Sequence, residues 1–290
     1  MLSAYAWMTK VAGPERWGPA PPYMDRGRLK GGLMYHESID HFANFADGKV
    51  KALKRNPSGF FIGAMMAGAY VGFGIILIFI LGSDADPQSR KLIMGASFGI
   101  ALTLVVFAGS ELFTGHNMYM PLGWFKKRIT GSDLIVVWVT VWLGNLAGSA
   151  FVGGLFVLGG ASGIVDVSDS FVNHVAGGKM NAPAVELLAR GMLCNWLVCL
   201  ALWMAGRTSD DAAKCIVIFW CLFAFIASGF EHSVANMTLF TIALLGEHPE
   251  AVSLSGAGYN LLWVTIGNLL SGSFFMAGGY WLYSGGNGGR

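Results

Sequence analysis

The sequence predicts an all-helical membrane protein with six transmembrane helices, arranged as an inverted repeat of three plus three. Of its 290 residues, 54% are hydrophobic and 12% are charged, which is about half the charged share of soluble domains. Its mean hydropathy is +0.55. Two polar interruptions of eleven residues, 108–118 and 227–237, lie 119 residues apart, and each places a Glu and a His inside an apolar segment. A matching pair of interrupted segments in two halves indicates a transport site.

Six segments are apolar and long enough to cross a bilayer, which takes about 20 residues. The second and fifth contain the interruptions, and we expect both helices to be broken, because non-helical backbone at membrane depth must be buried in protein or line a polar cavity. A second duplication, Leu143–Leu146 and Ile266–Leu269, has a similar offset of 123 residues. The six spans are 59–82, 91–121, 134–160, 183–206, 213–245 and 257–283.

The distribution of Lys and Arg predicts that both termini are cytoplasmic. Cytoplasmic loops of membrane proteins carry an excess of these residues. One side of the predicted topology has nine, at 49, 51, 54, 55, 126, 127, 128, 207 and 214. The other side has three, at 90, 91 and 179.

The N-terminal part departs from this pattern. We expect residues 1–48 to be a disordered extension or a misassigned start, with Met34 as an alternative first residue, and residues 49–290 to form the transport domain. Apolar residues at helical spacing predict an amphipathic helix from about residue 38. That helix could lie on the cytoplasmic membrane surface or pack at the mouth of a pore. The apolar residues are Ile39, Phe42, Ala46, Val50 and Leu53.

The ionisable residues of the two interruptions are the candidate functional groups, because such residues at membrane depth are costly and usually face a cavity. His232 is expected to hydrogen-bond or protonate a passing anion, with a purely structural histidine as the alternative. Glu111, Glu231 and Asn236 are expected to brace the broken backbone, since a carboxylate in the path would repel anions. For His116, a structural function is favoured over lining the path.

Three further polar residues are candidates for the path. Thr114 offers a neutral hydroxyl suited to a selectivity position. Lys179, just before the fourth span, either attracts anions or extends to the membrane interface. Asn195 either lines the pore or makes an interhelical hydrogen bond. Arg190, in contrast, is expected to pair with Glu186 one turn away.

Other functions receive little support from the sequence. The four cysteines lie in apolar helices without a metal-ligand spacing, so neither a metal nor a cofactor is expected, and nothing indicates a nucleic-acid partner. A water or neutral-solute channel is a remote alternative, because the Asn-Pro-Ala boxes of aquaporins are missing from the interruptions. An intramembrane enzyme would need paired catalytic groups, and His36-Glu37 lacks a second histidine at that spacing.

Four motifs resemble the formate/nitrite transporter family over about residues 56–283. They are Met66–Gly72, Gly109–His116, Cys194–Cys199 and Ser228–Met237. His116 is similar to the pattern of the nitrite-type members. The resemblance implies a homopentamer in a bacterial cytoplasmic membrane, with an aquaporin-like pore in each protomer, and nitrite as the substrate. Formate and hydrosulfide are alternatives within the family.

The resemblance also implies which residues line the path. Thr114, His232, Lys179 and Asn195 match the family's polar path residues, and the spacing of sixteen residues between Lys179 and Asn195 is kept. Apolar constrictions flank the histidine in the family. The matching residues here are Phe98, Leu102, Leu112, Val198 and Phe225.

Overall fold

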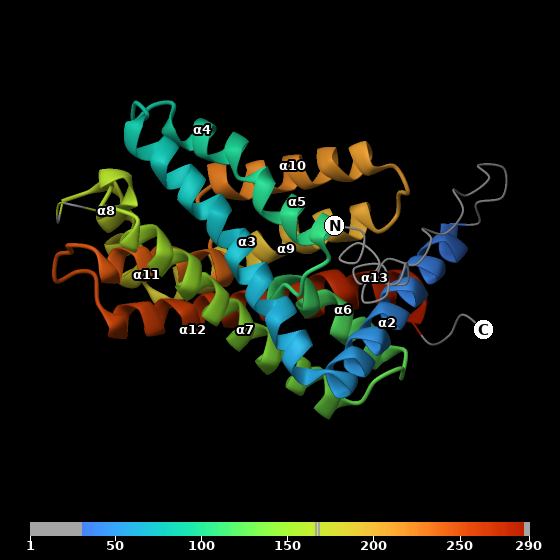
Figure 1. The fold of residues 1–290 in the computed structure, drawn as a ribbon. Coiled ribbons are helices and arrows are strands. Elements are labelled where there is room, and N and C mark those ends of the chain that lie inside the picture. Colours follow the sequence, from blue (N-terminus) through green and yellow to red (C-terminus); the bar gives the residue numbers. More distant parts are fainter. Residues whose placement is uncertain (1–30, 166, 168, 287–290) are drawn as a thin grey trace, which may run out of the picture.

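The computed structural model describes residues 31–165, 167 and 169–286, and this part of the chain is helical without strands (Figure 1). Five helical segments are long and apolar enough to cross a membrane. They are α3 (Pro57–Asp84), α4 with α5 (Arg90–Ser97 and Gly99–Ala108), α7 (Gly131–Leu158), α9 (Ala184–Ala205), and the continuous segment of α12, η3 and α13 (Leu254–Leu270, Ser271–Gly278 and Gly279–Tyr283).

The predicted spans 91–121 and 213–245 are each divided in the structure. The first consists of α4, α5 and α6 (Phe113–Phe125), and the second of α10 (Asp211–Ala227) and α11 (Ser233–Leu245). The apolar helix α11 has only 13 residues, too few to cross a bilayer alone. In Figure 1 the connection between α5 and α6 and the connection between α10 and α11 both lie in the middle of the bundle.

Capping residues define the N-termini of the long helices α3 and α7. Asn56 caps α3 by accepting a hydrogen bond from the amide of Gly59, and Pro57 follows at the first helical position, where its missing N–H costs nothing. Thr130 and Asp133 form a reciprocal capping box at the start of α7, which satisfies two amides that the helix cannot.

Small residues bring α3 and α7 into close contact. A Cβ on Gly148 would lie 1.8 Å from the carbonyl oxygen of Met65, and one on Gly68 would lie 2.1 Å from that of Asn145. Only glycine permits this separation, as is common where membrane helices pack closely. Because α7 also packs against α11, this contact fixes one wall around the interruptions.

The helix predicted from about residue 38 is α2, which begins at Gly31 and ends at Arg55. The helix therefore begins earlier than expected, and residues 31–37, which were expected to be disordered, are helical; residues 1–30 lie outside the described part. The apolar face of α2 packs against α6, and the ring of Phe42 stacks on that of Tyr119 at 5.3 Å. The structure thus has α2 packed at one end of the bundle.

The first and last described helices meet at that same end. The ring of Tyr35 in α2 stacks on that of Tyr280 in α13, with centroids 5.8 Å apart. Arg207 donates to the hydroxyl of Ser38 at 2.9 Å. Helix α8 (Phe171–Met180) lies at the other end, beside α11 (Figure 1). This segment lies between the predicted spans 134–160 and 183–206, and no helix was predicted for it.

Candidate functional site

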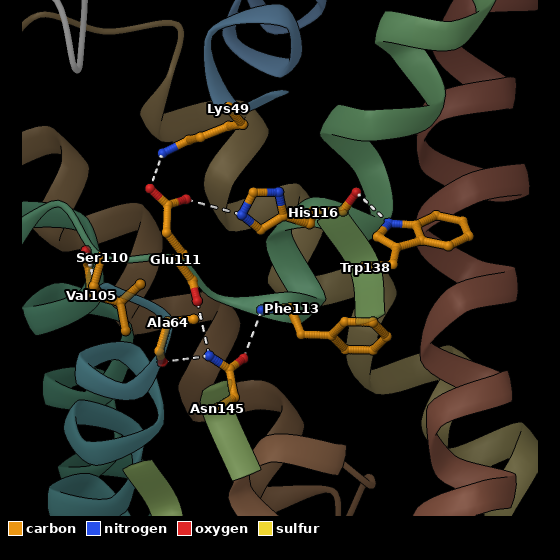
Figure 2. Close-up of polar contacts among 9 residues, drawn as sticks. All are labelled: Lys49, Ala64, Val105, Ser110, Glu111, Phe113, His116, Trp138 and Asn145. Atoms are coloured by element: carbon orange, nitrogen blue, oxygen red, sulfur yellow. Dashed lines mark hydrogen bonds and ion pairs between the residues drawn. The ribbon is translucent and has the colours of Figure 1, made fainter. Parts of the chain in front are cut away.

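The interruption between α5 and α6 is held by one asparagine from the neighbouring helix. Gly109 ends α5 in the left-handed conformation, with φ of 72°, which glycine adopts without strain. Asn145 of α7 then donates to the carbonyls of Ala64 and Glu111, at 2.7 and 2.9 Å, and accepts from the amide of Phe113 at 2.8 Å (Figure 2). The bonds to Glu111 and Phe113 satisfy backbone groups between α5 and α6 that have no partner within a helix.

The interruption between α10 and α11 repeats this arrangement. Gly229 is left-handed, with φ of 73°. Asn268 of α12 donates to the carbonyls of Gly191 and Glu231, at 2.8 and 3.1 Å, and accepts from the amide of Ser233 at 3.0 Å. The two interruptions are therefore held by matching sets of hydrogen bonds, from Asn145 in one and from Asn268 in the other.

The structural equivalence differs by one residue from the alignment of the two sequences. Helices α5 and α10 end 119 residues apart, whereas α6 and α11 begin 120 residues apart, because the second interruption is one residue longer. Glu111 then corresponds to Glu231, His116 to Asn236 and Leu112 to His232. The two histidines, which the sequence analysis treated as counterparts, occupy different positions.

A lysine and a histidine surround Glu111. Lys49 of α2 places Nζ 2.7 Å from Oε1, and His116 places Nε2 3.0 Å from Oε2 (Figure 2). The side chains of Lys49 and Glu111 are 11% and 9% exposed. The carboxylate therefore balances a cation, while Asn145 rather than the carboxylate braces the loop backbone.

The equivalent carboxylate, Glu231, is surrounded by a lysine and an asparagine. Lys179 of α8 lies 2.8 Å from Oε2, and Asn236 donates to the same oxygen at 2.6 Å. Asn260 accepts from Asn236 and donates to the carbonyl of Lys179. This cluster joins α8, α11 and α12 at the end of the bundle opposite α2.

A hydrogen bond between Thr114 and His232 joins the two interruptions. The hydroxyl of Thr114 lies 3.0 Å from Nε2 of His232, and Nδ1 of the same ring accepts the amide of Ala235 at 3.1 Å. Because Nδ1 accepts, the proton of a neutral imidazole must lie on Nε2. His232 therefore donates to Thr114, whose own hydroxyl proton is left to donate elsewhere.

Two small cavities lie on either side of Leu112, which lines both. The first includes Lys49, Glu111 and His116 in its lining and has about 300 Å³ of empty space, counting the part open to solvent. The second has about 220 Å³ by the same measure and is apolar apart from His232. Its lining contains all the residues expected at the constrictions, namely Phe98, Leu102, Leu112, Val198 and Phe225.

Two expected path residues have other contacts. Lys179 is paired with Glu231, and Asn195 donates to the carbonyl of Asn268 at 2.7 Å, which is the interhelical alternative. Neither belongs to the lining of the two cavities. Arg190 pairs with Glu186 at the surface, as the sequence indicates.

Lys49 and the two bracing asparagines were missed as site residues. Lys49 was used only to orient the chain, although it continues the apolar face of α2 that contains Phe42 and Ala46, at helical spacing. That pattern is a signal for a lysine directed into the protein. The repeated Gly-Asn pairs, Gly144-Asn145 and Gly267-Asn268, were noted as a duplication, but their spacing alone does not reveal what the amides contact.

Comparison with known proteins places the chain in a family. The family model described as "Formate/nitrite transporter" matches residues 39–282. The chain belongs to the formate/nitrite transporter family. The match begins within α2, so the likeness extends further towards the N-terminus than the motifs alone indicated. The family consists of transporters, which excludes the enzyme alternative.

Relatives and solved structures agree with this membership. The chain is 54% identical over 248 residues to the "Nitrite transporter NirC" of Escherichia coli, covering 86% of this chain and 92% of the relative. It is 37% identical to a "Probable formate transporter" of Methanothermobacter thermautotrophicus, and the match covers 75% of this chain and 86% of the relative. A solved "FNT family ion channel" superposes with a TM-score of 0.84 at 53% identity, and the match covers 86% of this chain and 99% of that structure. A solved "Pentameric formate channel with formate bound" superposes with a TM-score of 0.67 at 25% sequence identity. The match covers 79% of this chain and 98% of that structure.

Proposed function

We propose that this chain transports nitrite, and other small monovalent anions, across a bacterial cytoplasmic membrane through a path inside each protomer. The observation that carries the proposal is the Thr114–His232 hydrogen bond, which joins the two interruptions beside an otherwise apolar cavity. Burying polar side chains in a membrane-spanning segment costs free energy, and residues that accept this cost usually line a transport path. The 54% identity to a nitrite transporter favours nitrite, and formate is the alternative, because relatives named for formate are also matched.

The proposed topology has six crossings in two inverted halves, with α10 and α11 together forming the fifth. The contact between Tyr35 and Tyr280 supports it, because chain ends on the same side require an even number of crossings. The proposed assembly is a homopentamer with an aquaporin-like protomer, in line with the pentameric formate channel. Large exposed hydrophobic side chains, such as Phe73, Phe151 and Trp220, would face lipid or neighbouring protomers.

In the proposed path an anion meets a lysine at each end. Lys49 and Lys179 are each paired with a buried glutamate, yet their side chains remain 11% and 21% exposed. Each can attract an anion while the glutamate keeps the empty site close to neutral. Attraction of this kind raises the local anion concentration at a mouth.

The centre of the proposed path lowers the cost of an anion in an apolar surrounding, where an unpaired charge is strongly unfavourable. His232 donates Nε2–H to Thr114, and the hydroxyl of Thr114 donates to the anion. Hydrogen bonds in such a chain strengthen one another. With Nδ1 occupied by the amide of Ala235, His232 acts as a hydrogen-bond donor rather than a proton donor, which favours the first of its two expected functions.

Flux into proteoliposomes tests the proposal. We expect nitrite to enter faster than formate at pH 7, after subtraction of the rate in protein-free liposomes at the same pH. We expect His232→Phe to lower the nitrite rate by roughly tenfold, because the hydroxyl of Thr114 is no longer oriented by His232 and its hydrogen bond to the anion, of a kind worth about 1.5–3 kcal/mol, is weakened. His232→Asn should retain more of the rate, and exposed His174→Asn should match the wild type. Equal rates for both His232 variants and the wild type from pH 5 to pH 8 would exclude the proposed function of His232.

A further inference from the structure

The two glutamate clusters share a lysine and a buried glutamate, and they differ in the residue five positions after the glutamate. In each, a lysine from an end helix pairs with a buried glutamate of an interruption. The residue five positions after the glutamate contacts the same carboxylate, and it is His116 in the first half and Asn236 in the second. Asn236 demonstrates that an amide is sufficient to contact such a carboxylate. The histidine therefore adds something beyond that contact, and what a histidine adds is the ability to take up and release a proton near neutral pH.

The ring of His116 is held in an orientation suited to proton exchange. Its Nε2 faces the carboxylate of Glu111 at 3.0 Å, and its other nitrogen points away from that carboxylate (Figure 2). Among the described residues, Nδ1 has no hydrogen-bond partner, although the residue is only 1% exposed. A buried polar atom without a partner is uncommon and calls for an explanation. His232 differs, since both of its ring nitrogens have partners.

The charges around His116 balance when its ring is neutral, so an arriving anion can change its protonation state. The charged and titratable groups that face it are Glu111 on the interruption, Lys49 on α2 and Tyr119 on α6. With His116 neutral, Lys49 and Glu111 balance each other. The other neighbours are uncharged. The ring of Phe60 from α3 faces that of His116, Leu202 from α9 lines the same cavity, and the indole of Trp138 from α7 donates to the backbone carbonyl of His116.

We propose that Nδ1 of His116 is the proton-exchanging atom of the path, in the cavity between α2 and Leu112. The proposal rests on the proposed function and specifies where the proton is exchanged. An anion attracted by Lys49 enters this cavity, and its charge favours the uptake of one proton from the bulk solution onto Nδ1 of His116, through the side of the cavity that is open to solvent. The Nδ1–H bond then breaks and an O–H bond forms on the anion, while the electron pair stays on Nδ1. The neutral acid continues past Leu112 and accepts the hydrogen bond of the Thr114 hydroxyl there, as an anion arriving from the Lys179 end does before it reaches His116. Glu111 keeps Nε2 of His116 as the donor throughout.

This assignment explains why a carboxylate lies so close to an anion path. A carboxylate on one ring nitrogen fixes the orientation of an imidazole and stabilises its protonated form, as it does where histidine acts as a base. Glu111 does this for His116 and also neutralises Lys49. At the opposite end, where Asn236 replaces the histidine, no proton would be exchanged, and Lys179 attracts the anion only.

The test compares the wild type with His116→Asn, the residue that the chain itself has at the equivalent position. Nitrite uptake is measured at equal internal and external pH between pH 8 and pH 6, with protein-free rates subtracted. We expect the wild-type rate to rise on the order of tenfold, following the protonation of a histidine. His116→Asn should still transport, but with a change of less than about twofold over the range. His174→Asn, the same substitution at an exposed site, should keep the wild-type profile.

A rise in the rate of His116→Asn equal to that of the wild type would overturn the proposal. If this variant does not fold, His116→Gln replaces it with the same expectations. A second readout is independent of flux: nuclear magnetic resonance of ¹³C-labelled histidines should give a signal that is missing from the variant and that titrates in the wild type. Nitrite should shift its midpoint to higher pH. A His116 signal that does not titrate between pH 5 and pH 8 would overturn the proposal as well.

Failure of the proposed function gives a different result. If the wild type carries neither nitrite nor formate at any pH, anion transport itself is excluded, and the proton step falls with it. If the wild type carries nitrite and His116→Asn keeps the full pH profile, transport stands and only the assignment of the proton to His116 is wrong.

Discussion

The hydroxyl of Thr114 and Nε2 of His232 form a hydrogen bond that joins the two interruptions. Thr114→Val keeps the shape of the side chain and removes this hydroxyl. Nε2–H of His232 then loses its acceptor in a fully buried position, which costs about 1–3 kcal/mol, and an anion loses its proposed donor. We expect the nitrite rate in proteoliposomes to fall roughly tenfold, since about 1.4 kcal/mol corresponds to a factor of ten.

Thr114→Ser is the matched control for that change, because it keeps the hydroxyl and removes only a methyl group. We expect it to retain most of the wild-type rate. If Thr114→Val and Thr114→Ser transport equally well, the hydroxyl does not contact the anion, and Thr114 only fills space beside His232.

At this scale the sequence identified the residues that ionise but not their partners. Glu111, Glu231, His116 and His232 stand out because charge is rare in apolar segments. Their contacts depend on a shift of one residue between the two interruptions, which no alignment of two short motifs reveals. Lys49 was missed for a related reason: it lies 62 positions before Glu111, at the predicted domain boundary, on a helix most of which was expected to lie outside the transport domain.

Among the helices, the contact between α3 and α7 is the one most restricted by side-chain size. Gly148→Ala would place a methyl group 1.8 Å from the carbonyl oxygen of Met65, so α3 must move away from α7. Forcing extra atoms into a packed contact costs about 1–3 kcal/mol. We expect a clear fall in the midpoint of thermal unfolding in detergent, followed by the loss of the folded peak in size-exclusion chromatography.

Gly154→Ala on the same helix is the control. There the added methyl group would lie 3.9 Å from Leu245, an ordinary contact, and alanine favours a helix over glycine by up to about 1 kcal/mol. Its midpoint should equal or exceed that of the wild type. Equal losses for the two variants would mean that glycine matters on α7 for a reason other than the approach of α3.

The elements themselves were predictable where apolar runs are long. The spans predicted at 59–82, 134–160 and 183–206 correspond to α3, α7 and α9 to within three residues at each end. Helices α2 and α8 were harder to recognise. The first is amphipathic rather than apolar, so only its part from about residue 38 was predicted, and the second has only 10 residues. Tertiary contacts rather than local sequence determine where these two helices lie.

For the whole molecule, the question left by these elements is how many times the chain crosses the membrane. Five helical segments qualify by length and composition, which would put the two ends on opposite sides. The contact of Tyr35 with Tyr280 puts α2 and α13 together. An even number follows if α10 and α11, joined by their interruption, count as one crossing. A crossing made of two short helices is acceptable in lipid because Asn268 and the surrounding helices satisfy the open backbone.

Labelling of single cysteines in intact cells distinguishes six crossings from five. The native cysteines 194, 199 and 221 are buried, so a membrane-impermeant maleimide should report on cysteines introduced at exposed positions. With six crossings and cytoplasmic ends, Gln88→Cys in the α3–α4 connection should react in intact cells, whereas Lys51→Cys in α2 and Tyr283→Cys in α13 should react only after lysis. The unaltered protein under both conditions measures the background from Cys215. With five crossings the two ends would lie on opposite sides of the membrane, so either Lys51→Cys or Tyr283→Cys would react in intact cells. That result would exclude the inverted repeat, because two halves of opposite orientation need three crossings each.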